Sequence, residues 1–257
     1  MRLVLLGDPV SHSRSPSIHR AALAACGIAG TYTARRVDAA GVYRAAAEVR
    51  AGTLSGANVT MPHKTVAAGA ADRLTRAAAA AHSVNTLLAR DGEVVGESTD
   101  VGALTDVWGR RGLPGDVPVL VLGAGGAAAA AVVALRGRKV LVSARREAAA
   151  AALAAAHPGA VPHPWGAPAT GAVVVNATPL GMDGEALPEG VMAAASGLVD
   201  LAYGPDPTPA VREAGRRNLP AADGIDVLVA QAARSFRLWT GREAPLAVME
   251  AAARRGP

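Results

Sequence analysis

The 257 residues, 51% hydrophobic and 18% charged, suffice for one large or two modest folded domains, and this composition argues against a disordered chain. No stretch has the roughly 20 unbroken apolar residues that cross a bilayer, and the N-terminus does not read as a signal peptide, so we expect a cytoplasmic protein with no membrane partner. The net charge of +5 comes from scattered arginines with only 3% aromatic residues, which argues against nucleic acid and favours an anionic small molecule.

Short apolar runs and helical patterns alternate along the first hundred residues. Ser15-Pro16 predicts a helix start, with Ser15 as the N-cap and Pro16 as the first helical residue. Asp91-Gly92 between two apolar pairs predicts a hairpin. The expected elements are strands at 3–6, 32–37 and 56–60 and helices at 16–26, 41–51 and from 62 onward.

From about residue 102 the alternation becomes more regular. Strands that alternate with helices predict a parallel sheet, so we expect an α/β protein with two lobes. The last two helices could pack on either lobe. The expected elements are strands at 117–122, 140–142, 173–175 and 198–201 and helices at about 225–240 and 244–255.

A glycine-rich turn directly follows the strand at 117–122. The run Gly123-Ala124-Gly125-Gly126-Ala127-Ala128 fits the pattern G-x-G-x-x-G/A between a strand and a helix. Gly123 permits a tight turn, Gly125 lets a pyrophosphate approach the backbone, and the helix N-terminus offers free N–H groups to phosphates. The pattern predicts a dinucleotide site, and the alternative is a tight connection in a chain rich in Ala and Gly.

The next strand carries a signal for which dinucleotide binds. An acidic residue at its end would bind the ribose 2′-hydroxyl of NAD, but the sequence there is Ser143-Ala144-Arg145-Arg146. Guanidinium groups match a 2′-phosphate, so Arg145 and Arg146 favour NADP. A solvated arginine pair is the alternative.

Four polar strings in the first half lie beside apolar strands, at 11–16, 58–64, 84–86 and 98–100. They offer hydroxyl and amide groups with one ammonium, Lys64, and one carboxylate, Asp100, which suits a polyhydroxylated acid. Only Lys64 and Lys139 among the 26 basic residues are lysines, and lysine can exchange a proton where arginine stays protonated. Oxidising an alcohol needs a hydride acceptor and a group that takes the hydroxyl proton, and Lys64 paired with Asp100 could be that group. An ordinary surface pair, or no pair, is the alternative. The histidines show no metal-ligand spacing, so we expect no metal.

Taken together, these strings resemble the shikimate dehydrogenase family over about residues 7–241. The family reduces 3-dehydroshikimate with NADPH on the route to chorismate and the aromatic amino acids. The resemblance implies a substrate domain formed by 1–101 and 229–257, and a Rossmann-type, doubly wound NADP domain at 102–228. The markers are Ser13-Arg14-Ser15-Pro16, Asn58-Val59-Thr60 with Lys64, Asn85-Thr86, Thr99-Asp100, Gly123 to Ala127, Asn176-Ala177-Thr178, Asp200 with Tyr203, and Gln231 with Phe236, Trp239 and Gly241.

The resemblance also implies roles for individual residues. Lys64 and Asp100 would be the catalytic pair, and Ser13 and Ser15 would bind the substrate carboxylate. Tyr203 would close over the substrate. The groups implied to hold ring hydroxyls are Asn58, Thr60, Asn85, Asp100 and Gln231. The groups implied to line the cofactor are Gly123, Ala124, Gly125, Gly126, Ala127, Arg145, Arg146, Asn176, Ala177 and Thr178.

Several positions depart from the family pattern. His82 stands where the family usually has glycine, which is expected to affect a backbone turn, and Ser83 and Ser98 replace the usual Ala and Asn. They leave open a dehydrogenase for quinate or for an amino analogue of shikimate. A ligand sensor without catalysis is a further alternative, against which the retained Lys64 and Asp100 argue. We expect a small cyclic hydroxy acid as substrate and a monomer or homodimer.

Overall fold

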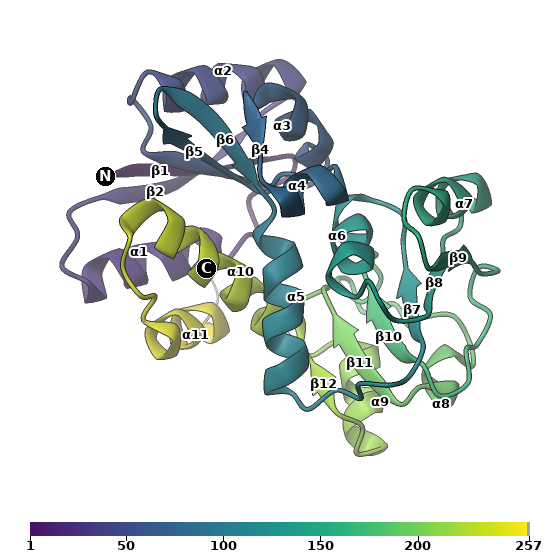
Figure 1. The fold of residues 1–257 in the computed structure, drawn as a ribbon. Helices are drawn as coiled ribbons and strands as arrows, with labels where there is room; N and C mark the ends of the chain where they lie inside the picture. The colour runs from purple at the N-terminus through teal and green to yellow at the C-terminus, as the bar shows by residue number, and fades with distance from the viewer. Residues whose placement is uncertain (256–257) are drawn as a thin grey trace. The chain divides into compact units, whose positions relative to one another are not determined.

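A computed structural model describes residues 1–255 and divides into two compact units. The first unit comprises Met1–Gly102 and the chain from Leu228 onward, and the second comprises Ala103–Val227 (Figure 1). The strands are β1 Arg2–Gly7, β2 Thr31–Arg36, β3 Gly56–Val59, β4 Arg73–Leu74, β5 Thr86–Arg90, β6 Glu93–Glu97, β7 Val119–Leu122, β8 Val140–Ser143, β9 Ala160–Pro162, β10 Val173–Asn176, β11 Gly197–Asp200 and β12 Ala221–Ala222. The helices are α1 Ser15–Ala25, α2 Ala39–Arg50, α3 Lys64–Ala70, α4 Arg76–Ala81, α5 Thr99–Arg110, α6 Gly126–Ala134, α7 Glu147–Ala155, α8 Val191–Ala194, α9 Pro209–Arg216, α10 Gly224–Thr240 and α11 Leu246–Arg255.

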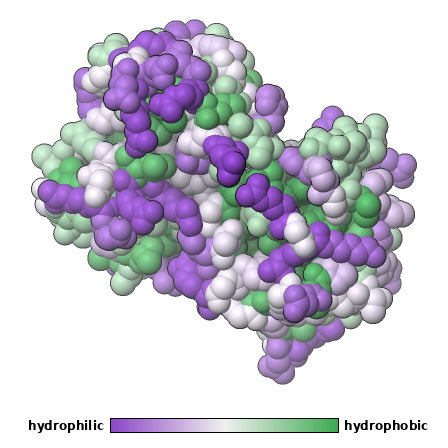
Figure 2. Space-filling model, in the orientation of Figure 1, coloured by the Kyte–Doolittle hydropathy of each residue, from purple (hydrophilic) through white to green (hydrophobic). Residues whose placement is uncertain are grey.

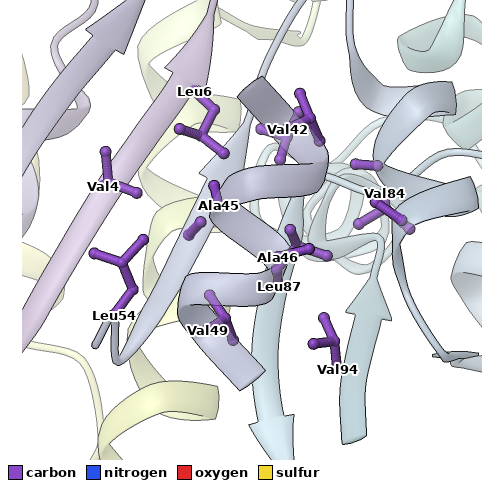
Figure 3. Close-up of a cluster of buried hydrophobic side chains, with 14 of the residues drawn as sticks. Val4, Leu6, Val42, Ala45, Ala46, Val49, Leu54, Val84, Leu87 and Val94 are labelled. Carbon is purple, nitrogen blue, oxygen red and sulfur yellow. The ribbon is translucent and has the colours of Figure 1, made fainter. Parts of the chain in front are cut away.

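The first unit is built on a mixed six-stranded sheet with the order β2-β1-β3-β5-β6-β4. One face of this sheet packs against α2 and α3 through an apolar cluster (Figure 3). Because side chains alternate along a strand, Val4 and Leu6 of β1 point to this face, where Val42 and Val49 of α2 meet them. All four are fully buried, and such burial stabilises by about 1.5–3 kcal/mol per side chain.

The opposite face of the same sheet is polar where it meets α10. Asn58 lies between Ala57 and Val59, which belong to the apolar cluster, so its side chain points to the other face. A Cβ on Gly56 would lie 2.2 Å from Nε1 of Trp239, so the absence of a side chain lets α10 approach β3 closely. Trp239 also donates a hydrogen bond from Nε1 to the carbonyl oxygen of Leu87, 3.1 Å away. This close approach brings the polar residues of α10 to those of the sheet.

The second unit is built on a six-stranded sheet in which every pairing is parallel. Its order, β12-β11-β10-β7-β8-β9, is that of a Rossmann-type doubly wound sheet. Strands β8 and β9 are added on one side of β7, and strands β10 to β12 on its other side, so the topological switch point lies between β7 and β10. Ligands of such sheets bind at this point, at the carboxyl ends of the strands. Gly123 follows β7 and Ala177 follows β10. The two-sheet α/β architecture expected from the sequence is confirmed.

The start of α1 differs from the sequence prediction. Ser15 was expected to cap the helix, but it is the first helical residue, and the N-cap is Arg14 without a side-chain capping bond. The Arg14 guanidinium instead donates to the carbonyl oxygen of Ala253 in α11, 2.8 Å away. The sequence pattern could not foresee this because the partner is 239 residues away along the chain.

Among residues 1–255, no helix is both long enough and apolar enough to cross a membrane. Figure 2 shows hydrophilic side chains on both units, with the alanine-rich α7 as a pale green area. Its exposed alanines are too small to form a strongly apolar surface.

Candidate active site

Lys64 and Asp100 meet, as the sequence analysis required. Lys64 begins α3, and its carbonyl oxygen accepts a hydrogen bond from Val84 N at 3.0 Å. Asp100 lies in the first turn of α5. Nζ of Lys64 donates to Oδ2 of Asp100 at 2.5 Å, and the two side chains are only 18% and 11% exposed. This is therefore a largely desolvated ion pair, in contrast to most of the other ion pairs among residues 1–255.

Asn85 holds the other carboxylate oxygen. Its Nδ2 donates to Oδ1 of Asp100 at 2.9 Å and lies 3.2 Å from Oε1 of Gln231. Its Oδ1 accepts from Thr99 N at 2.8 Å. Asp100 is thus fixed on both oxygens, one by an amide and one by the ammonium.

Asn58 lies behind Asn85 and is 3% exposed. Its Nδ2 lies 2.9 Å from the carbonyl oxygen of Asn85, 3.0 Å from Oγ1 of Thr86 and 3.1 Å from Oγ of Ser235. Its Oδ1 accepts from the hydroxyl of Tyr32 at 2.7 Å. Both ends of this amide are therefore used within the protein, which leaves little capacity for a ligand.

Apart from Tyr203, the remaining predicted substrate residues lie in the same unit. Ser15 is buried, and its N–H donates to Oγ of Ser13, which is half-buried, at 3.3 Å. Thr60 is half-buried directly after β3, and Gly7 makes room for it, since a Cβ there would lie 2.4 Å from Thr60 Cγ2. Gln231 is half-buried on α10, where its Nε2 donates to the carbonyl oxygen of Leu228.

Two residues of this network belong neither to the predicted site residues nor to the family markers. Ser235 is fully buried on α10, one turn after Gln231, and lies 2.8 Å from Oγ1 of Thr86 through its Oγ. Tyr32 is 1% exposed on β2. The four-residue spacing from Gln231 could have suggested Ser235, but no local pattern marks Tyr32.

His82 ends α4 in the left-handed conformation, with φ 44° and ψ 40°. Glycine adopts this conformation without strain, whereas a residue with a Cβ does not. The backbone at this position therefore keeps the conformation that glycine favours, and His82 adopts it with conformational strain. Ser83 and Ser98 are buried, and neither hydroxyl has a hydrogen-bond partner among the described residues.

His19 gives the chain a testable dependence on acid. It is fully buried, with its ring stacked on Tyr32 at 4.4 Å and neither ring nitrogen in a hydrogen bond with a described residue. Burial lowers the pKa of His19 from 6.5 to about 3. Between these values the unfolded chain binds a proton that the folded chain excludes, so stability present above pH 6.5 is lost as the pH falls toward 3.

We expect His19 alone to lower the free energy of unfolding by about 2 kcal/mol between pH 6.5 and pH 5, at about 1.4 kcal/mol per pH unit. Urea unfolding at the two pH values measures this. His19→Leu should reduce the pH dependence, whereas the same change at the exposed His12 should not. An equal pH dependence in His19→Leu and the unmodified protein would show that His19 is not the source.

In the second unit, Gly123 forms the turn between β7 and α6. Its φ is +114°, and a Cβ there would lie 2.8 Å from the carbonyl oxygen of Ala177. Both features require glycine. Helix α6 begins at Gly126 after Gly125 as N-cap, with no side chain bonded to the first turn. Ala124 and Ala127 are half-buried, and a Cβ on the exposed Gly125 would meet no atom within 4 Å.

Arg145 and Arg146 follow β8 and are both exposed. Arg146 is the N-cap residue of α7. Within residues 1–255, neither guanidinium makes a hydrogen bond or an ion pair with a side chain. Glu147 is the first residue of α7, past the end of the strand, so the strand end carries two cationic groups and no acid.

Asn176 ends β10 and is fully buried. Its Nδ2 donates to Oδ1 of Asp200 at 2.8 Å and to the carbonyl oxygen of Leu180 at 2.9 Å, and its Oδ1 accepts from Thr178 N and Oγ1. Asn176 therefore shapes the 177–180 turn, and the half-buried Thr178 is the more accessible of the two. Desolvation raises the pKa of Asp200, against which hydrogen bonds from Thr208, the backbone N–H of Ala202 and Asn176 act.

Tyr203 follows β11 and is half-buried. A Cβ on Gly224 would lie 2.3 Å from the carbonyl oxygen of Ala202 and 2.9 Å from Cβ of Tyr203. Glycine at this position therefore lets the first residue of α10 pack against the segment that carries Tyr203.

Two family models match the chain, almost entirely within its first unit, and full-length relatives cover both units. Residues 5–87 match the family model described as the shikimate dehydrogenase substrate binding domain, and residues 224–254 match that of the shikimate 5'-dehydrogenase C-terminal domain. A protein of Thermus thermophilus named shikimate dehydrogenase (NADP(+)) is 36% identical over 99% of this chain and 98% of its own length. One of Salinibacter ruber with the same name is 38% identical over 96% and 94%.

A solved structure gives the same result. The crystal structure of shikimate 5-dehydrogenase from Thermus thermophilus in complex with NADP(H) and shikimate has a TM-score of 0.88 and 34% identity, and the match covers 99% of both chains. The resemblance inferred from the sequence is confirmed. The chain belongs to the shikimate dehydrogenase family.

Proposed function

We propose that the chain is an NADP-dependent shikimate dehydrogenase that reversibly reduces 3-dehydroshikimate to shikimate. The observation that carries the proposal is the ammonium of Lys64, held 2.5 Å from Asp100 in a largely buried polar cluster. The relatives named shikimate dehydrogenase (NADP(+)), and the related structure with NADP(H) and shikimate, support this substrate and cofactor.

In the reduction, the ketone carbon gains a hydride and the ketone oxygen gains a proton. The bound nicotinamide supplies the hydride. Lys64 donates the proton from Nζ to the oxygen as it becomes a hydroxyl, and takes it back in the oxidation. Asp100 and Asn85 keep the ammonium in one place, which removes the need to order it during the reaction.

The polar side chains of the first unit provide the contacts for the substrate. In this proposal Ser13 and Ser15 bind the ring carboxylate through their hydroxyls, and Thr60 and Gln231 hold ring hydroxyls together with Asn85. Asn58 has one lone pair of Oδ1 left for a ring hydroxyl, because its other groups are bonded within the protein. Tyr203 would close over the substrate.

The residues of the second unit fit a dinucleotide. At Gly123 there is no room for a Cβ, which would lie 2.8 Å from the carbonyl oxygen of Ala177. The N–H groups in the first turn of α6 have no side-chain acceptor, so they are available to phosphates. We propose that these groups bind the pyrophosphate, that Thr178 lines the nucleotide, and that Arg145 and Arg146 bind the 2′-phosphate of NADP.

Replacing both Arg145 and Arg146 with Ala should raise KM for NADP about a hundredfold and leave KM for NAD nearly unchanged. Hydrogen bonds to charged groups contribute about 1.5–3 kcal/mol each, and about 1.4 kcal/mol is tenfold in affinity. Steady-state rates with each cofactor measure the effect, with Arg136→Ala, an exposed arginine of the same unit, as control. Equal rises for NADP and NAD would assign the two arginines a role other than reading the 2′-phosphate.

The function itself is tested by the initial rates on shikimate and on quinate, each with NADP and with NAD. We expect the highest kcat/KM for shikimate with NADP. Faster turnover of quinate with NAD would replace this proposal with a quinate dehydrogenase. No turnover with any pair would leave a ligand-binding protein.

A further inference from the structure

We propose that Tyr32 is a positioning residue for the Lys64–Asp100 pair and acts through Asn58 and Asn85. The inference rests on the proposed function only in naming the pair as the reacting groups. It comes from a continuous line of hydrogen bonds that begins at Tyr32, on the strand at the edge of the first sheet, and ends at the ammonium of Lys64.

The line begins at a phenol that is itself held in place. The Tyr32 ring is 1% exposed and stacks on His19 at 4.4 Å with an interplanar angle of 7°. Trp239 lies tilted against both rings, at 5.4 Å from His19 and 6.4 Å from Tyr32. Because the three rings pack against one another, the Tyr32 ring has little freedom to move. Its hydroxyl donates a hydrogen bond to Oδ1 of Asn58 at 2.7 Å.

Asn58 passes this restraint to Asn85. The group nearest to its Nδ2 is the carbonyl oxygen of Asn85 at 2.9 Å, which can only accept a hydrogen bond. An inverted amide would set two oxygens against each other there, so Asn85 fixes which end faces it and Tyr32 anchors the other end. Without the phenol, Oδ1 of Asn58 would lose the donor that lies 2.7 Å away, and the amide could tilt away from Asn85.

Asn85 completes the line with a hydrogen bond from Nδ2 to Oδ1 of Asp100 at 2.9 Å, and Asp100 accepts from Lys64 on its other oxygen. Ser235 of α10 contacts the other end of the Asn58 amide from Tyr32: its Oγ lies 3.1 Å from Nδ2 of Asn58 and 2.8 Å from Oγ1 of Thr86. Groups that orient a reacting side chain in this way commonly change activity by about 10–100-fold when they are removed, by analogy with residues behind metal ligands.

The test is Tyr32→Phe, which removes one oxygen atom and keeps the ring that stacks on His19. We expect kcat for shikimate to fall about tenfold, with KM for NADP unchanged. The matched control is Tyr43→Phe, the same change at a half-exposed tyrosine of the same unit. Ser235→Ala should have a smaller effect in the same direction. The kcat of the double variant Tyr32→Phe/Ser235→Ala should lie within about twofold of the kcat of Tyr32→Phe, because both changes act on Asn58.

A second measurement does not depend on the activity. In the unmodified protein, the side-chain amide protons of Asn58 and Asn85 should give separate NMR signals that exchange slowly with solvent. In Tyr32→Phe the signals of both residues should shift and exchange faster, and in Tyr43→Phe neither should change. If the unmodified protein does not oxidise shikimate, the proposed function fails, and the NMR result alone decides on Tyr32.

Two results would overturn the inference. One is a Tyr32→Phe protein whose Asn85 amide signals are the same as those of the unmodified protein. The other is an active unmodified protein whose kcat is not lowered by Tyr32→Phe. If Tyr32→Phe does not fold, as circular dichroism would show, Ser235→Ala takes its place in both measurements, with the same two results counting against the inference.

Discussion

Lys64→Ala should lower kcat about 10²–10⁴-fold while KM for shikimate changes only a few-fold, as expected for a group that transfers a proton in the transition state. The substrate contacts proposed for the hydroxyl and amide groups remain in this variant, so binding should persist. Steady-state rates over a range of shikimate concentrations separate kcat from KM.

Lys139→Ala is the matched control, because it removes the only other lysine of the chain, which is exposed in the second unit. We expect it to leave both constants unchanged. A Lys64→Ala protein that keeps most of its kcat would remove Lys64 from the chemistry, and the ion pair with Asp100 would then be structural.

Gly123→Ala should destabilise the protein by about 2–4 kcal/mol and weaken NADP binding at least tenfold. The variant combines a φ of +114° with a Cβ 2.8 Å from the carbonyl oxygen of Ala177, and neither the turn nor that backbone atom can move easily. Urea unfolding gives the stability, and calorimetric titration with NADP gives the affinity.

Gly137→Ala separates the two causes. Gly137 also has a positive φ, +91°, but a Cβ there would meet no atom within 4 Å. It should cost about 1–2 kcal/mol, the strain of the backbone conformation alone, without affecting NADP. If both variants lost the same stability and the same affinity, the close approach between Gly123 and Ala177 would be irrelevant to the nucleotide.

Much of the fold could be predicted because its signals are local. The apolar runs at 3–6 and 173–175 lie within strands, the run at 117–122 contains β7, which begins at Val119, and the glycine-rich turn lies between β7 and α6 as the pattern requires. The meeting of Lys64 with Asp100 was implied by the family resemblance, whereas the residues alone left open an ordinary surface pair or no pair.

The parts that could not be predicted depend on contacts distant in sequence. Tyr32 and Ser235 look like ordinary members of a strand and a helix until the fold brings both to Asn58. The bonds of Asn176 to Asp200 and to its own turn were not foreseen either, and its role toward the cofactor stays a prediction. Ser15 fits the N-cap pattern, yet the helix begins at Ser15 itself, and the N-cap residue Arg14 is hydrogen-bonded to α11.

The claim that Lys64 transfers the proton is tested most directly by Lys64→Arg, in a single turnover of shikimate with NADP followed by the absorbance of NADPH. Arginine keeps the positive charge beside Asp100 but stays protonated, so it cannot accept the hydroxyl proton. The account predicts NADPH formation at least about a hundredfold slower than in the unmodified protein. NADPH formation by Lys64→Arg within about threefold of the unmodified rate would show that the site needs only a cation, and would contradict it.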